Sequence, residues 1–285
     1  MSHIPLTNTE STIVGYWSPV TASVDWCETN YAVTPYIAEF FNATSNIFPI
    51  LAGIALFLRA RSLGLAARFQ LAPLFLVLVG LGSAGFHGTL LYGPQLGDEL
   101  PMIYMGLVLC YISLRLRSAD YPHRPWIPYA MAVFAVIYSA LHIHYRLVGA
   151  FHVICALILI PVAGLVIPIA KNDQKLQRMM WTASVLLVGS SILWGLDQAY
   201  CPTIENLYLH ALWHVGTALA FVQWLEAMML VQLRMTHAHV DLDAVAHLLT
   251  IVRVDNVSEK AQLHSVPPPQ PSMAFGYGTV TPGRQ

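Results

Sequence analysis

The chain has 285 residues, of which 56% are hydrophobic and only 10% charged, and its formal net charge at pH 7 is -1. Soluble domains carry about 25% charged residues, so this composition excludes an ordinary soluble protein and indicates an integral membrane protein. No basic stripe is present, so the sequence does not indicate a nucleic-acid-binding protein.

Seven segments are apolar and long enough to cross a bilayer, which takes about 20 residues. They are Tyr36–Leu58, Phe69–Tyr92, Asp98–Leu116, Trp126–His144, Leu147–Ala170, Arg178–Tyr200 and Leu207–Leu233. The connections are short and no internal repeat is evident, so we expect a single bundle over residues 36–234. The predicted fold is an all-α integral membrane protein with seven transmembrane helices.

The basic residues predict how the bundle is oriented. Residues 1–35 lack the basic start and long apolar core of a cleavable signal peptide, so we expect the first span to direct insertion. Lys and Arg residues accumulate in the first, third and fifth loops and in the tail after Leu233, whereas the fourth loop carries only Arg146. Because basic loops face the cytosol, this alternation predicts a lumenal N-terminus and a cytosolic C-terminus.

The four cysteines fit this orientation. Cys27, in the N-terminal segment, and Cys201, at the end of the sixth span, both fall on the lumenal side. Cys110 and Cys155 fall within spans, where cysteines usually serve packing. Because disulfides persist in oxidising compartments, we expect Cys27 and Cys201 to form a disulfide that ties the N-terminal segment to the bundle.

The composition changes after Arg234. Residues 236–254, THAHVDLDAVAHLLTIVRV, could form a short amphipathic helix, and Pro, Ser, Gly and Gln dominate from Asp255 on. Such a composition cannot bury enough apolar surface to fold alone. We therefore expect residues 235–285 to form a cytosolic, largely disordered tail.

Three histidines fall near the lumenal ends of two spans. His210 and His214 are four residues apart at the start of the seventh span, so their imidazoles share one helix face. Alone, such a pair is more often a packing or hydrogen-bonding feature than a metal site. His87 lies about one and a half turns before the end of the second span, at a matching depth. Three imidazoles with an open coordination position are typical of a catalytic zinc site.

Two further polar residues fall at this end of the bundle. Ser83 precedes His87 by four residues, and Asp98 opens the third predicted span. Asp98 could accept a proton from the attacking water, and Ser83 could donate a hydrogen bond to the oxyanion of an attacked carbonyl. The alternative is that Ser83 bonds its own helix and Asp98 caps the third span. The predicted position of these two residues and the three histidines at one depth in the membrane favours a hydrolase.

A second polar cluster precedes the first span. It consists of Asp25, Trp26, Glu28 and Asn30, with Glu39 at the start of the helix. Carboxylates, an amide and a backbone carbonyl are hard oxygen ligands that suit Ca²⁺. The spacing does not match the EF-hand loop, and a solvated acidic loop whose charge stabilises a helix N-terminus is the alternative interpretation.

Three stretches together resemble the alkaline ceramidases. They are DWCETNY at 25–31, GSAGFHGTLLYGPQLGDELPMIY at 82–104 and LWGLDQAYCPTIENLYLHALWH at 193–214. These seven-helix enzymes belong to a superfamily of membrane hydrolases that includes the adiponectin receptors, and the match extends over essentially all seven spans. The resemblance implies hydrolysis of ceramide to a sphingoid base and a fatty acid, within the endoplasmic reticulum or Golgi membrane.

The resemblance also implies a site, residue by residue. It implies a zinc site of His87, His210 and His214, a catalytic pair of Ser83 and Asp98, a calcium site of Asp25, Trp26 (through its carbonyl), Glu28, Asn30 and Glu39, and a Cys27–Cys201 disulfide. It leaves open whether ceramide, dihydroceramide or phytoceramide is preferred, and it says nothing of protein partners. The rival interpretation is a non-enzymatic seven-helix receptor braced by zinc, which the presence of Ser83 and Asp98 argues against.

Overall fold

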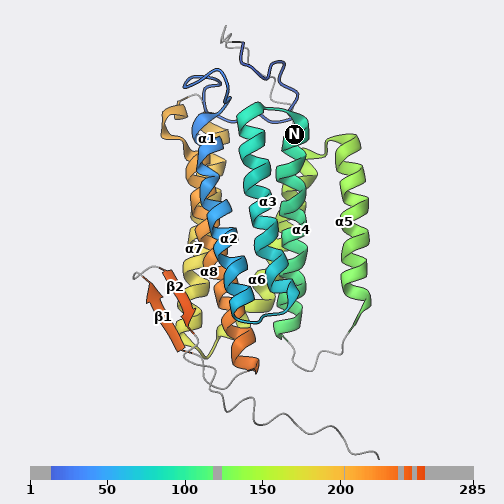
Figure 1. The fold of residues 1–285 in the computed structure, drawn as a ribbon, viewed down its shortest axis with the longest axis vertical. Coiled ribbons are helices and arrows are strands. Elements are labelled where there is room, and N and C mark those ends of the chain that lie inside the picture. Colours follow the sequence, from blue (N-terminus) through green and yellow to red (C-terminus); the bar gives the residue numbers. More distant parts are fainter. Residues whose placement is uncertain (1–13, 118–123, 202, 237–240, 246–248, 254–285) are drawn as a thin grey trace, which may run out of the picture.

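The computed structural model describes residues 14–117, 124–201, 203–236, 241–245 and 249–253 (Figure 1). Within these residues, seven helical segments are long and apolar enough to span a membrane. They are Phe40–Ser62, Ala67–Thr89, Tyr92–Arg117, Trp126–Tyr145, Val148–Ala170, Gln174–Tyr200 and Glu205–Thr236. The predicted seven-helix membrane fold is confirmed.

Some of these spans consist of two pieces. The first span comprises α1 (Phe40–Ser45) and α2 (Ile47–Ser62), the fifth comprises α6 (Val148–Val166) and the 3-10 helix η1 (Ile167–Ala170), and the seventh comprises η2 (Glu205–Leu207) and α8 (Leu209–Thr236). The others are single helices: α3 (Ala67–Thr89), α4 (Tyr92–Arg117), α5 (Trp126–Tyr145) and α7 (Gln174–Tyr200). They lie side by side in one bundle, with α5 at the edge next to α4 (Figure 1).

The helix that carries His210 and His214 is the centre of the bundle. In the most apolar stretch of each span, 72% of the residues are buried in Glu205–Thr236 but only 11% in Trp126–Tyr145. A helix that is buried all round must be apolar on every face, which the composition of α8 provides. Four polar side chains of α8, those of His210, His214, Gln223 and Glu226, therefore lie inside the protein rather than against lipid.

Two glycines bring α3 and α4 into backbone contact. A Cβ atom on Gly82 would lie 2.1 Å from the carbonyl oxygen of Gly97 and 2.6 Å from the amide nitrogen of Asp98. Small residues permit such close crossings between membrane helices. Ser83 follows one of these glycines and Asp98 follows the other, so the crossing places both predicted catalytic residues at the same level.

The N-terminal segment crosses one end of the bundle and is fixed there (Figure 1). The disulfide between Cys27 and Cys201 is present, with Cα atoms 5.4 Å apart, so this prediction is confirmed. The backbone N–H groups of Thr21 and Ala22 donate to the carbonyl of Leu90 at 3.1 and 3.0 Å. The segment is thus joined to the ends of both α3 and α7.

The third span begins earlier than predicted. Helix α4 starts at Tyr92 rather than Asp98, so Asp98 lies inside the helix and the interpretation of it as a helix cap is wrong. The first turns are polar, which is why hydropathy alone misses them. Gln95 and Glu99 are buried there and satisfy each other, with Gln95 Nε2 donating to Glu99 Oε1 at 2.8 Å.

The stretch after α8 forms strands instead of the predicted amphipathic helix. β1 (Asp241–Val245) pairs antiparallel with β2 (Leu249–Arg253). β2 contains Thr250, Ile251 and Val252, and β-branched residues favour extended structure. The rest of the predicted disordered tail lies outside the described residues.

Candidate metal centre

The three predicted zinc ligands converge. His87 on α3 and His210 and His214 on α8 are at most 4% exposed, and each offers one ligand atom within 4.8 Å of the others. The ring centroid of His87 lies 4.9 Å from that of His210 and 5.1 Å from that of His214. Within the described residues this is the only group of three or more His, Cys, Asp or Glu side chains that could hold a metal ion.

Two of the ring nitrogens in this group lack a hydrogen-bond partner. Nδ1 of His87 donates to Glu39 Oε2, and its Nε2 is buried without a hydrogen bond. Nδ1 of His210 is likewise buried and unpartnered. A buried polar atom without a hydrogen-bond partner costs about 1–3 kcal/mol of stability. A metal ion bound by these two nitrogens would remove that cost. Three nitrogen donors suit Zn²⁺.

Neighbouring polar groups fix the rings. Ser45 Oγ lies 2.8 Å from His214 Nδ1. Glu39 is fully buried and bonds His87, and its Oε2 also accepts from Asn42 Nδ2 at 3.2 Å. Partners of this kind set the tautomer and orientation of metal-binding imidazoles.

Ser83 and Asp98 face the same space. Ser83 Oγ lies 3.4 Å from His214 Nε2, so its hydroxyl points toward the histidines, as the hydrolase interpretation requires. Asp98 lines the adjoining cavity from α4, and so does Ser83 from α3. The structure therefore places both residues of the predicted catalytic pair on the wall of a cavity that His210 and His214 also line.

The predicted calcium ligands lie beside this centre, but several already have partners. Asn30 Nδ2 donates to both carboxylate oxygens of Asp25, at 3.2 and 3.1 Å. The oxygens of Glu28 accept the backbone N–H groups of Phe41 and Asn42 at 2.7 and 2.8 Å, so this carboxylate caps α1. Unlike the histidines, these carboxylates do not form a converging group of three within the described part of the chain.

The acidic cluster is nevertheless electrostatically strained. Burial, together with the charge of Glu39 beside it, raises the pKa of Asp25 to about 7. The side-chain oxygen of Asn30 is buried without a partner. A cation bound between these side chains would stabilise the charged form of the Asp25 carboxylate.

Trp26 contributes its ring to the metal centre. The indole stacks on His210, with ring centroids 3.8 Å apart and planes 29° apart. Its backbone N–H donates to Glu39 Oε1 at 2.9 Å. The sequence interpretation assigned only the Trp26 carbonyl a role, and the stacking shows that the N-terminal segment also covers the ring of one candidate metal ligand.

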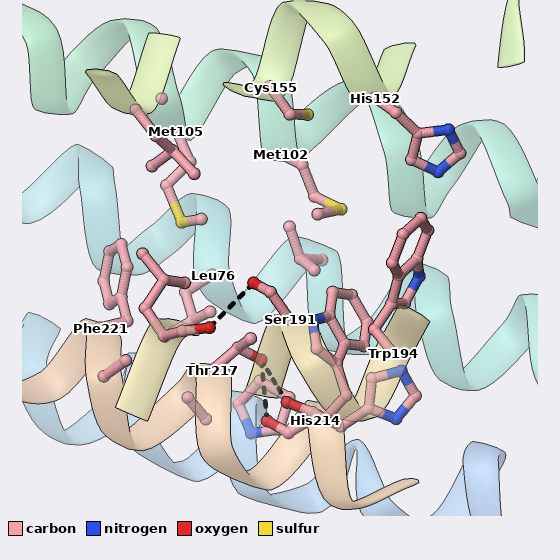
Figure 2. A pocket seen from close by; sticks show the side chains of 18 of the residues that line it. Leu76, Met102, Met105, His152, Cys155, Ser191, Trp194, His214, Thr217 and Phe221 are labelled. Carbon is pink, nitrogen blue, oxygen red and sulfur yellow. Dashed lines mark hydrogen bonds between the residues drawn. The ribbon is translucent and has the colours of Figure 1, made fainter. Parts of the chain in front are cut away.

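A cavity of about 640 Å³ extends from the histidines between α3, α4, α6, α7 and α8. Figure 2 shows its wall, which is mostly apolar and includes Leu76, Met102, Met105, Cys155 and Phe221. A largely apolar cavity with a few polar groups at one place is the usual form of a small-molecule site. Its dimensions and lining suit a hydrocarbon chain attached to a polar group at the histidines.

Comparison with known proteins identifies the family. Residues 18–250 match the family model described as Ceramidase. The chain belongs to the ceramidase family. It is 33% identical over 211 residues to alkaline ceramidase of Arabidopsis thaliana, and this match covers 71% of the present chain and 81% of the relative. It is 32% identical over 249 residues to alkaline ceramidase YPC1 of Saccharomyces cerevisiae (74% and 76%) and 29% identical over 219 residues to alkaline ceramidase 3 of Mus musculus (72% and 82%). The resemblance stated from the sequence is confirmed.

In this ceramidase-family chain, sequence reasoning overlooked a buried pair, Glu99 and His142, of which Glu99 lines the same cavity. Glu99 Oε2 lies 2.5 Å from His142 Nε2, which joins α4 to α5. The rule that ionisable residues inside spans are functional candidates would have found both residues. Ser45 was overlooked as well, and a lone serine in a membrane helix gives no such signal.

Proposed function

We propose that this chain is a zinc-dependent amidohydrolase that cleaves ceramide within the membrane to a sphingoid base and a free fatty acid. The observation that carries the proposal is the convergence of His87, His210 and His214 beside a large apolar cavity, with a buried, unpartnered ring nitrogen on each of the first two. The names of the relatives, all alkaline ceramidases, support ceramide as the substrate class.

The residues of the site divide the chemistry among them. Zinc held by the three histidines would polarise the amide and lower the pKa of water toward about 7. Asp98 accepts the proton of the attacking water and passes it to the amide nitrogen, so that a C–O bond forms as the C–N bond breaks. Ser83 donates a hydrogen bond from its hydroxyl to the oxyanion. Trp26 shields the face of His210 from solvent.

The membrane setting suits a lipid with two chains. Ceramide would enter between helices from the bilayer, with its amide at the histidines and one chain in the cavity. The disulfide supports placement of this end of the bundle in an oxidising compartment, because disulfides persist there. With the alternating basic loops, this favours a lumenal active site in the endoplasmic reticulum or Golgi membrane.

Calcium is proposed as a supporting ion. Asp25, Glu28, Asn30, Glu39 and the Trp26 carbonyl would bind it, which requires the Asn30 amide to turn its unpartnered oxygen toward the ion. The raised pKa of Asp25 supports the proposal, because a cation would stabilise its charged form. The ion would hold the N-terminal segment over the metal centre without contacting substrate.

Purified protein in detergent micelles, supplied with ceramide and assayed for released sphingoid base, tests the proposal. The wild-type protein should release base, His210→Ala should not, and His144→Ala, which alters an exposed histidine on α5, should match the wild type. A folded wild-type protein that binds zinc and releases no base from any ceramide would instead indicate a receptor braced by the metal.

A further inference from the structure

Helix α1 presents one side to the metal centre. Glu39 is the N-cap of α1, and Asn42 and Ser45 follow at intervals of three residues. Residues three apart lie on the same side of a helix. Glu39 accepts a hydrogen bond from Nδ1 of His87, and Ser45 Oγ lies 2.8 Å from Nδ1 of His214. Two of the three candidate metal ligands are therefore held from one short helix, each through the same ring nitrogen.

The Ser45 hydroxyl has two close contacts but only one hydrogen to donate. Its Oγ lies 2.9 Å from the backbone carbonyl oxygen of Asn42 and 2.8 Å from Nδ1 of His214. A carbonyl oxygen can only accept, whereas a hydroxyl can donate once and also accept. If Ser45 donates to Asn42, its oxygen accepts the Nδ1–H of His214, and both contacts are hydrogen bonds. If Ser45 donates to His214 instead, two acceptor oxygens face each other and one hydrogen bond is lost.

The first arrangement fixes the tautomer of His214. A neutral imidazole carries one hydrogen, so a protonated Nδ1 leaves the lone pair on Nε2. Nε2 is the nitrogen that faces α3, where Ser83 Oγ lies 3.4 Å from it. His87, also on α3, has its Nδ1 bonded to Glu39 and its Nε2 buried without a partner. Each of these two rings therefore offers Nε2 to a metal ion.

We infer that Ser45 is a positioning residue, whose hydroxyl oxygen accepts a hydrogen bond from Nδ1 of His214 and so makes Nε2 the metal-binding atom. The inference rests on the proposed function, because it takes the histidines to bind zinc. Metal-binding histidines commonly donate their other ring N–H to a partner that fixes the ring. The Asn42 carbonyl sets the direction of the Ser45 hydroxyl, and it also accepts from Asn46 Nδ2 at 2.9 Å. Among the described residues, Ser45 does not line the cavity, so it acts through His214 rather than on the substrate.

Zinc affinity, measured by competition with a chelator of known affinity, tests the inference. Ser45→Ala removes the acceptor, so the His214 ring loses its fixed tautomer and orientation, and zinc should bind about tenfold more weakly. Ser45→Thr keeps a hydroxyl that can donate to the same carbonyl, and should restore most of the wild-type affinity. Thr44→Ala is the matched control on α1, because the exposed Thr44 hydroxyl donates to the carbonyls of Phe40 and Phe41. It should leave zinc affinity unchanged.

A spectroscopic measurement identifies the ring nitrogen itself. In zinc-loaded wild-type protein with isotope-labelled histidine, nuclear magnetic resonance should show a hydrogen on Nδ1 of His214 and none on Nε2. Because this measurement needs no variant, it tests the inference even if Ser45→Ala does not fold. In folded Ser45→Ala, the Nδ1 hydrogen should exchange faster with water than in wild type or Thr44→Ala. A hydrogen on Nε2 of His214 in the zinc-loaded wild type would overturn the inference, because Nδ1 would then be the ligand.

Neither measurement uses ceramide, so failure of this inference can be distinguished from failure of the proposed hydrolysis. If Ser45→Ala weakens zinc binding as expected but wild-type protein releases no sphingoid base, the hydrolysis fails while the role of Ser45 stands. If wild-type protein cleaves ceramide but Ser45→Ala binds zinc as tightly as wild type, the role of Ser45 fails while the hydrolysis stands.

Discussion

The carboxylate of Glu39 accepts a hydrogen bond from Nδ1 of His87 while its other oxygen accepts the backbone N–H of Trp26. One buried side chain therefore joins the N-terminal segment to the proposed metal centre. Glu39 and His87 are 48 residues apart in the sequence. This contact gives a physical route by which an event in the acidic segment reaches the histidines. It also directs the first prediction.

Glu39→Gln should weaken zinc binding. The amide cannot accept a hydrogen bond as strongly as the carboxylate, so His87 loses basicity and its fixed orientation, which typically costs about 10- to 100-fold in metal affinity. Competition with a chelator of known affinity measures this loss. Glu205→Gln, which removes a carboxylate bonded to Thr29 away from the histidines, should leave zinc affinity unchanged. Wild-type affinity in Glu39→Gln would show that the carboxylate does not support the metal.

Gly82→Ala should lower kcat. The added methyl group would meet the Gly97 carbonyl and the Asp98 amide, so α4 must move and Asp98 moves with it. A displacement of about 1 Å at a reacting group can cost about 100-fold in rate. Overpacking should also lower stability by about 1–3 kcal/mol.

Gly93→Ala is the matched control, because nothing lies within 4 Å of a Cβ atom there. It should retain kcat. If Gly82→Ala turns over ceramide at the wild-type rate, the crossing of α3 and α4 does not position the catalytic pair.

Loss of the Cys27–Cys201 disulfide should destabilise the protein. The two residues are 174 apart in sequence, and disulfides that close long loops typically contribute about 2–5 kcal/mol to small domains. Cys27→Ser, Cys201→Ser and the double variant should therefore share one lowered Tm, with no further loss in the double variant. Thermal melts with and without reductant check this, and additive losses in the two single variants would argue against a bond between these residues.

Calcium should stabilise the protein more at pH 8 than at pH 6. Asp25 has a pKa of about 7 in the folded protein, above its ordinary value of 3.8, so the folded state binds this proton more tightly than the unfolded state. Without calcium, the contribution of Asp25 to stability should therefore fall as the pH rises from about 4 to about 7. A bound cation stabilises the charged carboxylate and removes this loss.

Thermal melts with calcium or a chelator at the two pH values measure the effect. Asp25→Asn should reduce the dependence of the calcium response on pH and leave bound zinc unchanged; the remaining dependence comes from Glu39, because burial raises its pKa to about 8. A calcium response that is equally large in Asp25→Asn would place the ion elsewhere, for example on the lipid.

The sequence predicted those features that depend on local pattern. Span number followed from apolar length, and the histidine site followed from the i,i+4 spacing of His210 and His214 and the matching depth of His87. Where the physics is non-local, sequence reasoning was incomplete. The early start of α4 depends on buried bonds of Gln95 and Glu99, the hairpin after α8 replaced a predicted helix, and the bond from Glu39 to His87 joins segments that no periodicity relates.

The most direct test of the central claim is a zinc titration of chelator-treated protein, with bound metal and released sphingoid base measured on the same samples. Ceramide hydrolysis should be absent without zinc, rise in proportion to the metal bound, and saturate at one zinc per chain, because three histidines form one site. His87→Ala, His210→Ala and His214→Ala should each fail to recover activity under the same titration. Full ceramide hydrolysis by zinc-free protein would contradict the proposal that these histidines form a catalytic zinc centre.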